Sequence, residues 1–232
     1  MTSSTDVQAG IDNLLINCLC ITSGQSLLII REPADLDYYS ATLPNTIAAR
    51  ATELGVLVEI VTAPFRETIE ALPNNITSAI EQSDKGLFLA RIGDQVRFSN
   101  CFNPNDTAMC YALDEETFGT NFCGADYRFF SALKNKVDSA VFGGRDITIR
   151  CREGTNLAGV SQVIASDDQA RDVGLKRFPL GIFSPVLAST FSGTLAISKW
   201  LSPTGSRFYK PESVLIDGVV AAHIVCGRII EF

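Results

Sequence analysis

Aliphatic strand-like runs alternate with helix-like segments over residues 26–91, and this order constrains the fold more than any other feature of the chain. Three apolar runs predict buried strands, at 26–31, 56–61 and 86–91. Segments with helical spacing precede or separate them, at 6–20, 36–54, 65–72 and 74–82. Strands joined by helical crossovers pair in parallel and are covered on both faces. The sequence therefore predicts an α/β fold that opens with a parallel, doubly wound, Rossmann-like sheet.

The second half of the chain has a different pattern. A last helix is expected at 126–141, and Gly143-Gly144 breaks it, so we place a boundary between an α/β domain at 1–143 and a second domain at 144–232. Period-two alternation predicts strands at 146–152, 157–165, 193–198, 214–217 and 223–230, with turns at 202–205 and 217–218. The C-terminal domain is therefore predicted to be β-rich.

The composition argues against several classes of protein. With 232 residues, 46% of them hydrophobic, the chain can bury a core and does not belong to the disordered class. Its formal net charge of −7 repels phosphate backbones and anionic membrane surfaces, so neither nucleic acid nor a membrane is an expected partner. Residues 1–6 lack the features of a signal peptide, and no run of about 18 apolar residues occurs. We expect a cytoplasmic protein whose seven cysteines stay reduced.

Few residues of this chain have the pattern of a catalytic or metal site. His223 is the only histidine, and it lies in an apolar, strand-like run, so we interpret it as a structural or surface residue. The turns after the predicted strands lack the glycine-rich motifs that hold phosphates, and no Cys-x-x-Cys pair occurs. We therefore expect no cofactor, no bound metal and no catalytic residue.

Two arginines are the strongest candidates for a binding site. In the first predicted strand of the C-terminal domain, alternation puts Arg150 and Arg152 on one face with Thr148 beside them. Guanidinium groups bind carboxylates in bidentate, charge-assisted pairs, so this face suits an acidic peptide or a free C-terminal carboxylate. The alternative is that both arginines pair with acidic groups of the chain itself, such as Glu153 or Asp146.

The same hypothesis extends to four further residues. Thr155 and Asn156 follow the turn at Gly154 and would lie near an extended peptide held by main-chain hydrogen bonds. Arg91 and Arg97 lie near the carboxyl end of the third predicted strand, where ligands gather in doubly wound sheets, and are the alternative location. The predicted peptide-binding set is Thr148, Arg150, Arg152, Thr155, Asn156, Arg91 and Arg97.

Four short motifs occur in the order found in a known group of enzymes. They are D-Q-V-R at 94–97, R-E-G-T-N-L at 152–157, F-P-L-G-I-F-S-P at 178–185 and S-G-T-L at 192–195. In this order they resemble the metallo-aminopeptidases of the M29 type and the related dihydroxypyridine dioxygenases. The resemblance implies that the turn at Thr155-Asn156 opens the domain that is catalytic in that family. It also implies a metal-binding glutamate, in a Pro-x-Gly-Glu motif, at the position that Ile182 occupies in this chain.

The resemblance therefore implies the scaffold of these enzymes without their activity. The later segments that carry the remaining glutamate and histidine ligands in that family have no counterpart before Phe232. A shortened, metal-less member of the scaffold is similar to the small peptide-binding proteins of ribosomal-peptide pathways such as crocagin biosynthesis. We therefore expect a non-catalytic protein that binds or presents a precursor peptide to modifying enzymes. The alternatives are a metal-independent enzyme with Glu153 or Asp94 as base, and a degenerate subunit of a larger metallo-enzyme.

The last apolar run of the chain, at 224–230, predicts association. An exposed strand edge of this kind pairs with another strand or is covered by other parts of the protein. Because homodimers are the commonest closed oligomers, we expect two copies of the chain to associate.

Overall fold

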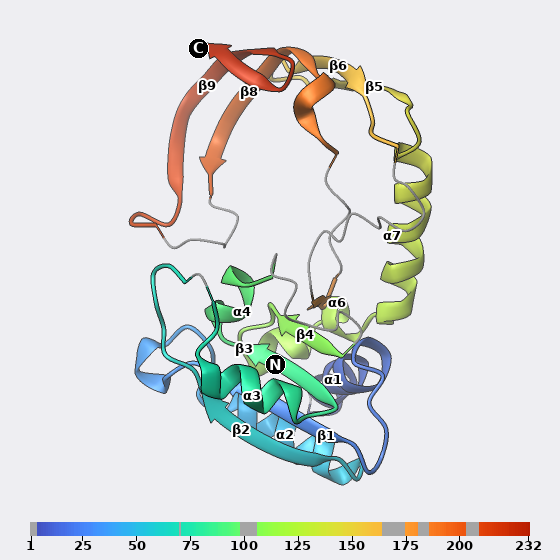
Figure 1. The fold of residues 1–232 in the computed structure, drawn as a ribbon, viewed down its shortest axis with the longest axis vertical. Coiled ribbons are helices and arrows are strands. Elements are labelled where there is room, and N and C mark those ends of the chain that lie inside the picture. The colour runs from blue at the N-terminus through green and yellow to red at the C-terminus, as the bar shows by residue number, and fades with distance from the viewer. Residues whose placement is uncertain (1–3, 70, 98–105, 164–174, 181–185, 203–208) are drawn as a thin grey trace. The chain divides into compact units, whose positions relative to one another are not determined.

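The computed structural model describes residues 4–69, 71–97, 106–163, 175–180, 186–202 and 209–232 (Figure 1). The chain divides into two compact units. The first comprises Met1–Lys134, Val173–Ile182 and Gly205–Arg207, and the second comprises Asn135–Asp172, Phe183–Thr204 and Phe208–Phe232. Among the described residues, no helix is both long enough and apolar enough to cross a membrane.

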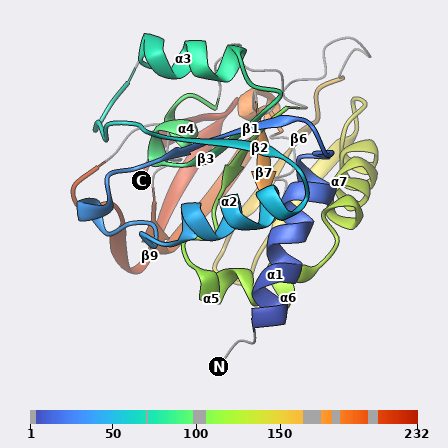
Figure 2. The ribbon, with the colours of Figure 1, turned by 90° about the horizontal axis from the view of Figure 1, so that it is seen from below.

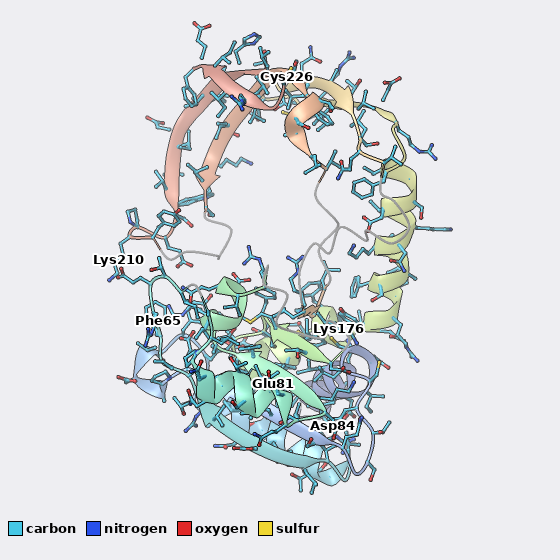
Figure 3. All side chains as sticks on the ribbon, in the orientation of Figure 1. Phe65, Glu81, Asp84, Lys176, Lys210 and Cys226 are labelled. Atoms are coloured by element: carbon cyan, nitrogen blue, oxygen red, sulfur yellow. The ribbon has the colours of Figure 1, made fainter. Side chains whose placement is uncertain are left out.

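A five-stranded parallel sheet forms the centre of the first unit. Its strands are β1 (Ser26–Arg31), β2 (Leu57–Thr62), β3 (Lys85–Leu89), β4 (Thr107–Cys110) and β7 (Lys176–Phe178), in the order β2-β1-β3-β4-β7. All four neighbouring pairs are parallel, which confirms the predicted α/β fold. The last strand comes from beyond residue 143, so the first sheet takes one strand from the segment that we assigned to the second domain. Lys176, which is labelled in Figure 3, also joins this strand to the N-terminal part of the chain, because its Nζ donates a hydrogen bond to the Cys18 carbonyl oxygen at 2.5 Å.

Helices cover both faces of this sheet. The α-helices among the described residues are α1 (Ser4–Asp12), α2 (Leu43–Glu53), α3 (Asn74–Glu81), α4 (Arg91–Gln95), α5 (Glu115–Phe118), α6 (Asn121–Gly124) and α7 (Tyr127–Val141), and α7 extends into the second unit. Figure 2 shows α3 on one face of the sheet and α1 and α2 on the other. The side chains of residues 27–30 and 87–89 are almost fully buried between these layers, as expected for strands covered on both sides.

The predicted helix at 6–20 forms, but its second half is wound differently. After α1, the segment Asn13–Cys18 is π-helical. Buried Asn13 explains the local change, because its side chain donates to the carbonyl oxygens of Cys123 and Ala125 at 2.7 and 2.6 Å and accepts from the Tyr127 N–H. π-helical turns commonly arise where a helix accommodates such a local demand. Asn13 therefore ties the first helix to α6 and α7.

Two other predicted helices differ from the structure. The expected helix at 36–54 begins only at Leu43, because Asp37 adopts a left-handed conformation with φ of 50° and ends a short 3-10 turn at Ala34–Leu36. The expected helix at 65–72 is wrong, since none of the described residues between β2 and α3 is helical. Pro64 and Pro73 flank this segment, and proline restricts the residue before it to extended conformations.

The second unit contains a five-stranded antiparallel sheet, which confirms the predicted β-rich C-terminal part. Its strands are β5 (Asp146–Arg150), β6 (Asn156–Val160), β8 (Ser192–Leu201), β9 (Val214–Val225) and β10 (Arg228–Glu231), in the order β10-β9-β8-β6-β5. A short 3-10 turn, Ala188–Thr190, precedes β8. The expected strand at 157–165 ends at Val160.

The expected turn at 217–218 is wrong, because these residues lie inside β9. Ser198 pairs with Val219 and Lys199 with Ile216, so Asp217 and Gly218 form a β-bulge within one continuous strand. The chain instead reverses at Cys226-Gly227, where both residues have positive φ values, 48° and 74°, as in a two-residue hairpin turn (Figure 3). A glycine in a strand pattern can therefore mark a bulge as readily as a turn.

Candidate functional site

β5 is an edge strand of the antiparallel sheet, and its hydrogen bonds show which residues direct their backbone N–H and C=O groups away from the sheet. The Ser161 N–H donates to the Arg145 carbonyl oxygen at 2.9 Å, and the Cys151 N–H donates to the Thr155 carbonyl oxygen at 3.1 Å. Residues 145 and 151 therefore turn their backbone polar groups toward β6. Because this direction alternates along an antiparallel strand, the even-numbered residues of β5 turn theirs to the open edge.

The side chains of these even-numbered residues lie together on one face. Thr148 and Arg150 are both exposed, and Arg150 is paired in register with Asn156. Its Nε donates to the Asn156 Oδ1 at 3.2 Å, which orients the guanidinium group. Arg152 departs from our prediction, because β5 ends at Arg150 and Arg152 lies in the following turn. The turn is closed by a hydrogen bond from the Gly154 N–H to the Cys151 carbonyl oxygen at 3.3 Å.

The internal ion pairs considered for these arginines are not formed. Among the described residues, no ion pair includes Arg150, Arg152, Asp146 or Glu153. Both guanidinium groups and the Asp146 carboxylate are therefore exposed charges beside an open strand edge.

Thr155 has a structural role next to this edge. It is buried, with 7% of its surface exposed, and its Oγ1 accepts a hydrogen bond from the Ala196 N–H at 3.1 Å. Hydrogen bonding from the Thr155 side chain, with backbone N–H groups of the turn, lowers the pKa of Cys151. Thr155 therefore holds β6 against β8 and is not available to a ligand.

The hydrogen bond from Thr155 leads to a prediction about Cys151. A hydrogen bond to the thiolate favours ionisation, so Thr155→Val is expected to raise the pKa of Cys151. At pH 7, the variant should then contain less thiolate and react more slowly with iodoacetamide, as followed by mass spectrometry. Thr155→Ser keeps the hydroxyl and should react like the parent, while exposed Cys20 and Cys226 serve as internal references. An unchanged rate at Cys151 in a folded Thr155→Val variant would contradict this account.

The other two predicted residues lie at the carboxyl edge of the parallel sheet, in the first unit. Arg91 begins α4 after β3, and its Nε and terminal nitrogen donate to the Glu32 carboxylate at 3.0 and 2.7 Å. The Glu32 carboxylate also accepts from the Arg91 backbone N–H. The Arg91 guanidinium carbon lies 4.2 Å from the ring centroid of Tyr38 and 4.1 Å from that of Phe65, which is labelled in Figure 3. β1 and β3 are the neighbouring strands at which the strand order reverses, where ligands bind in open α/β sheets.

Arg97 is also engaged by groups of its own unit. It is buried and pairs with Asp94 at 2.5 Å, while the Tyr111 hydroxyl donates to the same Asp94 oxygen at 2.5 Å. Burial, followed by the nearby negative charge of Asp94, raises the pKa of Tyr111. One oxygen of Asp94 thus accepts from a cation and from a hydroxyl group, and both stabilise the charged carboxylate, which disfavours the general-base role considered for it.

The structure therefore separates the predicted residues by role. Thr148, Arg150, Arg152 and Asn156 are exposed at the β5 edge, whereas Thr155, Arg91 and Arg97 are committed to internal contacts. The sequence reasoning missed Glu32, Tyr38, Phe65 and Tyr111. One signal was present for Glu32, because it directly follows a buried strand whose carboxyl end meets that of β3.

A metal centre like that of the resembling enzymes needs several donor side chains close together. Within residues 4–69, 71–97, 106–163, 175–180, 186–202 and 209–232, no three His, Cys, Asp or Glu side chains gather as a metal would require. The described donors therefore do not fit such a centre. Ile182, which occupies the position of the family's carboxylate, lies outside the described residues.

Comparison with solved structures supports the fold. The whole chain aligns with 68% of 2,5-dihydroxypyridine dioxygenase from Pseudomonas putida KT2440, with a TM-score of 0.63 and 14% identity. It also aligns over 98% of its length with 70% of AmpT from Thermus thermophilus, with a TM-score of 0.57 and 10% identity. No family model matches the chain, and no curated protein matches its sequence. At these identities the likeness is one of fold, and it agrees with the scaffold relationship inferred from the four motifs.

Proposed function

We propose that this chain is a cytoplasmic, non-catalytic protein that binds a precursor peptide at the open edge of β5 and presents it to modifying enzymes. The peptide carries an acidic residue or a free C-terminal carboxylate, and the pathway is a ribosomal-peptide pathway of the crocagin type. One observation supports the proposal above the others: Arg150 and Arg152 are exposed, outside any described ion pair, beside a regular strand edge.

The edge supplies the two components of peptide recognition by strand addition. Outward backbone groups of β5 supply main-chain hydrogen bonds, and alternate side chains supply specificity. A ligand residue opposite Arg150 places its side chain on the same face as the guanidinium group. Asp or Glu at that ligand position would form a charge-assisted pair, while neighbouring residues would meet Ile149 on the other face.

The alternative function is enzymatic or that of a degenerate subunit. The structural likeness to a dihydroxypyridine dioxygenase and to AmpT is compatible with a metal-independent enzyme or with a degenerate relative of such proteins. Both candidate bases are poorly placed for such chemistry, because Asp94 is held by Arg97 and Tyr111, and Glu153 is exposed in a turn. The resemblance to aminopeptidases supports a peptide as the ligand, and we therefore favour the binding function.

Simultaneous replacement of Arg150 and Arg152 by alanine tests the proposal. We expect the double variant to bind an acidic peptide roughly 2–5 kcal/mol more weakly, because the carboxylate loses both cationic partners. The melting temperature should change little, since both side chains are exposed. Calorimetric titration would use a synthetic peptide that alternates Glu with Val, and a matched peptide with Gln in place of Glu.

Arg228→Ala is the matched control, because Arg228 is exposed on β10 at the opposite edge of the same sheet. Equal affinities of the parent and the double variant for the Glu peptide would rule out this site. The pathway assignment has a separate check: a short precursor-peptide gene should lie beside the gene for this chain. A catabolic gene cluster in that position would favour the enzymatic alternative.

A further inference from the structure

The sequence of β5 is complementary to itself. Residues 146–150 read D-I-T-I-R, so an antiparallel second copy centred on Thr148 places Asp146 opposite Arg150 at both ends. The same register places Ile147 opposite Ile149 and Thr148 opposite the Thr148 of the second copy. We propose that β5 pairs with β5 of a second copy of this chain, across a two-fold axis at Thr148.

The backbone of β5 restricts the register of this pairing. Antiparallel strands bond where both opposing residues turn their N–H and C=O groups to each other. The residues of β5 that direct their backbone groups to the open edge are 146, 148 and 150. If the two-fold axis passed between two residues, each of these would lie opposite a residue of the second copy whose backbone groups face its own β6. The axis must therefore pass through a residue, and only Thr148 at the centre lets all five residues of the strand overlap.

The side chains select the same register. On the face of Thr148, the two Asp146–Arg150 pairs bring together opposite charges that are exposed and outside any described ion pair in the single copy. On the other face, each Ile149, 46% exposed, gains the Ile147 of the second copy as a neighbour. Opposite charges and β-branched pairs directly across two strands are the combinations that stabilise a sheet. An unprotected strand edge is thereby covered.

The other edge of this sheet, where we expected association through residues 224–230, is less suited to pairing than β5. β10 is four residues long, and its register with β9 shifts between Ile229 and Glu231. A bulge on an edge strand twists the edge and is a common device against sheet extension. β5 is paired with β6 over five consecutive residues without such a shift.

Self-pairing and peptide binding would compete for one edge, a consequence that rests on the proposed function, although the self-pairing does not. The Asp146 carboxylate of the second copy takes the place of the acidic group of the peptide at Arg150. A peptide that binds only single copies shifts the equilibrium toward them by mass action. The apparent affinity for the peptide should therefore fall as the concentration of the protein rises.

Exchange of the two charges tests the self-pairing. Sedimentation equilibrium of the parent should show monomers and dimers in exchange, with a dissociation constant of roughly 10 µM to 1 mM because the interface is small. Asp146→Arg and Arg150→Asp each oppose like charges twice and should weaken the dimer at least about tenfold. The double variant D146R/R150D restores opposite charges and should recover the dimer. An equimolar mixture of the two single variants should form a heterodimer.

Monomeric parent protein at about 1 mM, single variants that dimerise as well as the parent, or a double variant that stays monomeric would each overturn the pairing. Thr148→Pro removes an N–H at the open edge without removing a bond to β6, and its circular dichroism spectrum shows whether the fold is kept.

The self-pairing and the proposed peptide binding can be contradicted independently of each other. Asp146→Arg keeps Arg150, so a monomeric Asp146→Arg variant that ignores the Glu peptide contradicts the proposed function alone.

Discussion

Replacement of Glu32 by alanine is expected to lower the free energy of unfolding of the first unit by roughly 3–5 kcal/mol, as when one partner of a buried ion pair is removed. The side chains of Glu32 and Arg91 are only 4% and 18% exposed. Without the carboxylate, the Arg91 guanidinium group stays between the rings of Tyr38 and Phe65 with no anion from Glu32. The loss should appear as a lower urea midpoint in far-ultraviolet circular dichroism.

Two further variants separate the ion pair from side-chain loss in general. Glu59→Ala removes an exposed glutamate on β2 and should change stability by no more than about 0.5 kcal/mol. Replacing both partners, as in E32L/R91M, removes the charges together and should cost less than Glu32→Ala alone. A Glu32→Ala variant as stable as the parent would show that Arg91 finds another partner or water.

Replacement of Gly193 by alanine is expected to destabilise the antiparallel sheet by roughly 3 kcal/mol or more, because backbone strain and a steric clash act together. Gly193 has a φ of +130°, and a Cβ added there would lie 2.2 Å from the Asn156 carbonyl oxygen. The obstructing atoms belong to the backbone of β6, which is paired with β8 at this point. Neither strand can yield without losing that pairing.

The single tryptophan of the chain provides a local readout. Trp200 lies on β8, so its fluorescence during urea unfolding reports on the antiparallel sheet, whereas circular dichroism reports on both units. Gly124→Ala is the matched control, because Gly124 has ordinary φ and no atom lies within 4 Å of an added Cβ. A Trp200 transition in Gly193→Ala at the same urea concentration as in the parent would contradict the prediction.

The strands of the parallel sheet were predictable because their residues are apolar on both faces. β1 is the clearest case, since residues 27–30 are continuously apolar and no alternation competes with that pattern. Features that depend on distant residues were not predictable. Asn13 winds its helix into a π-turn through groups more than 100 residues away, and nothing near Asn13 in the sequence signals this. The return of Lys176–Phe178 to the first sheet is likewise a long-range pairing without a local signature.

The candidate site was predictable in part for the same reason. Alternation placed Thr148 and Arg150 on one strand face, and the structure has them there. Alternation could not reveal that the strand ends before Arg152, because the end depends on the turn closed by Cys151 and Gly154. The internal partner of Arg91 was also hidden, since Glu32 is 59 positions away from it in the sequence. Arg97 pairs with nearby Asp94, but the hydrogen bond from Tyr111 to that same carboxylate comes from another segment.

The course of the chain through its two units has a consequence for synthesis. β4 ends at Cys110, and its neighbour β7 begins only at Lys176, after the hairpin of β5 and β6 has been made. During translation, therefore, β4 is synthesised before the β5–β6 hairpin, and the parallel sheet stays incomplete at β4 until β7 has been made. Until β7 is added, the backbone groups of β4 on that side have no strand partner, and an unpaired edge of this kind tends to pair with other chains. The two units are compact in space, but no single cut in the gene separates them, because segments of the first unit lie on both sides of a segment of the second.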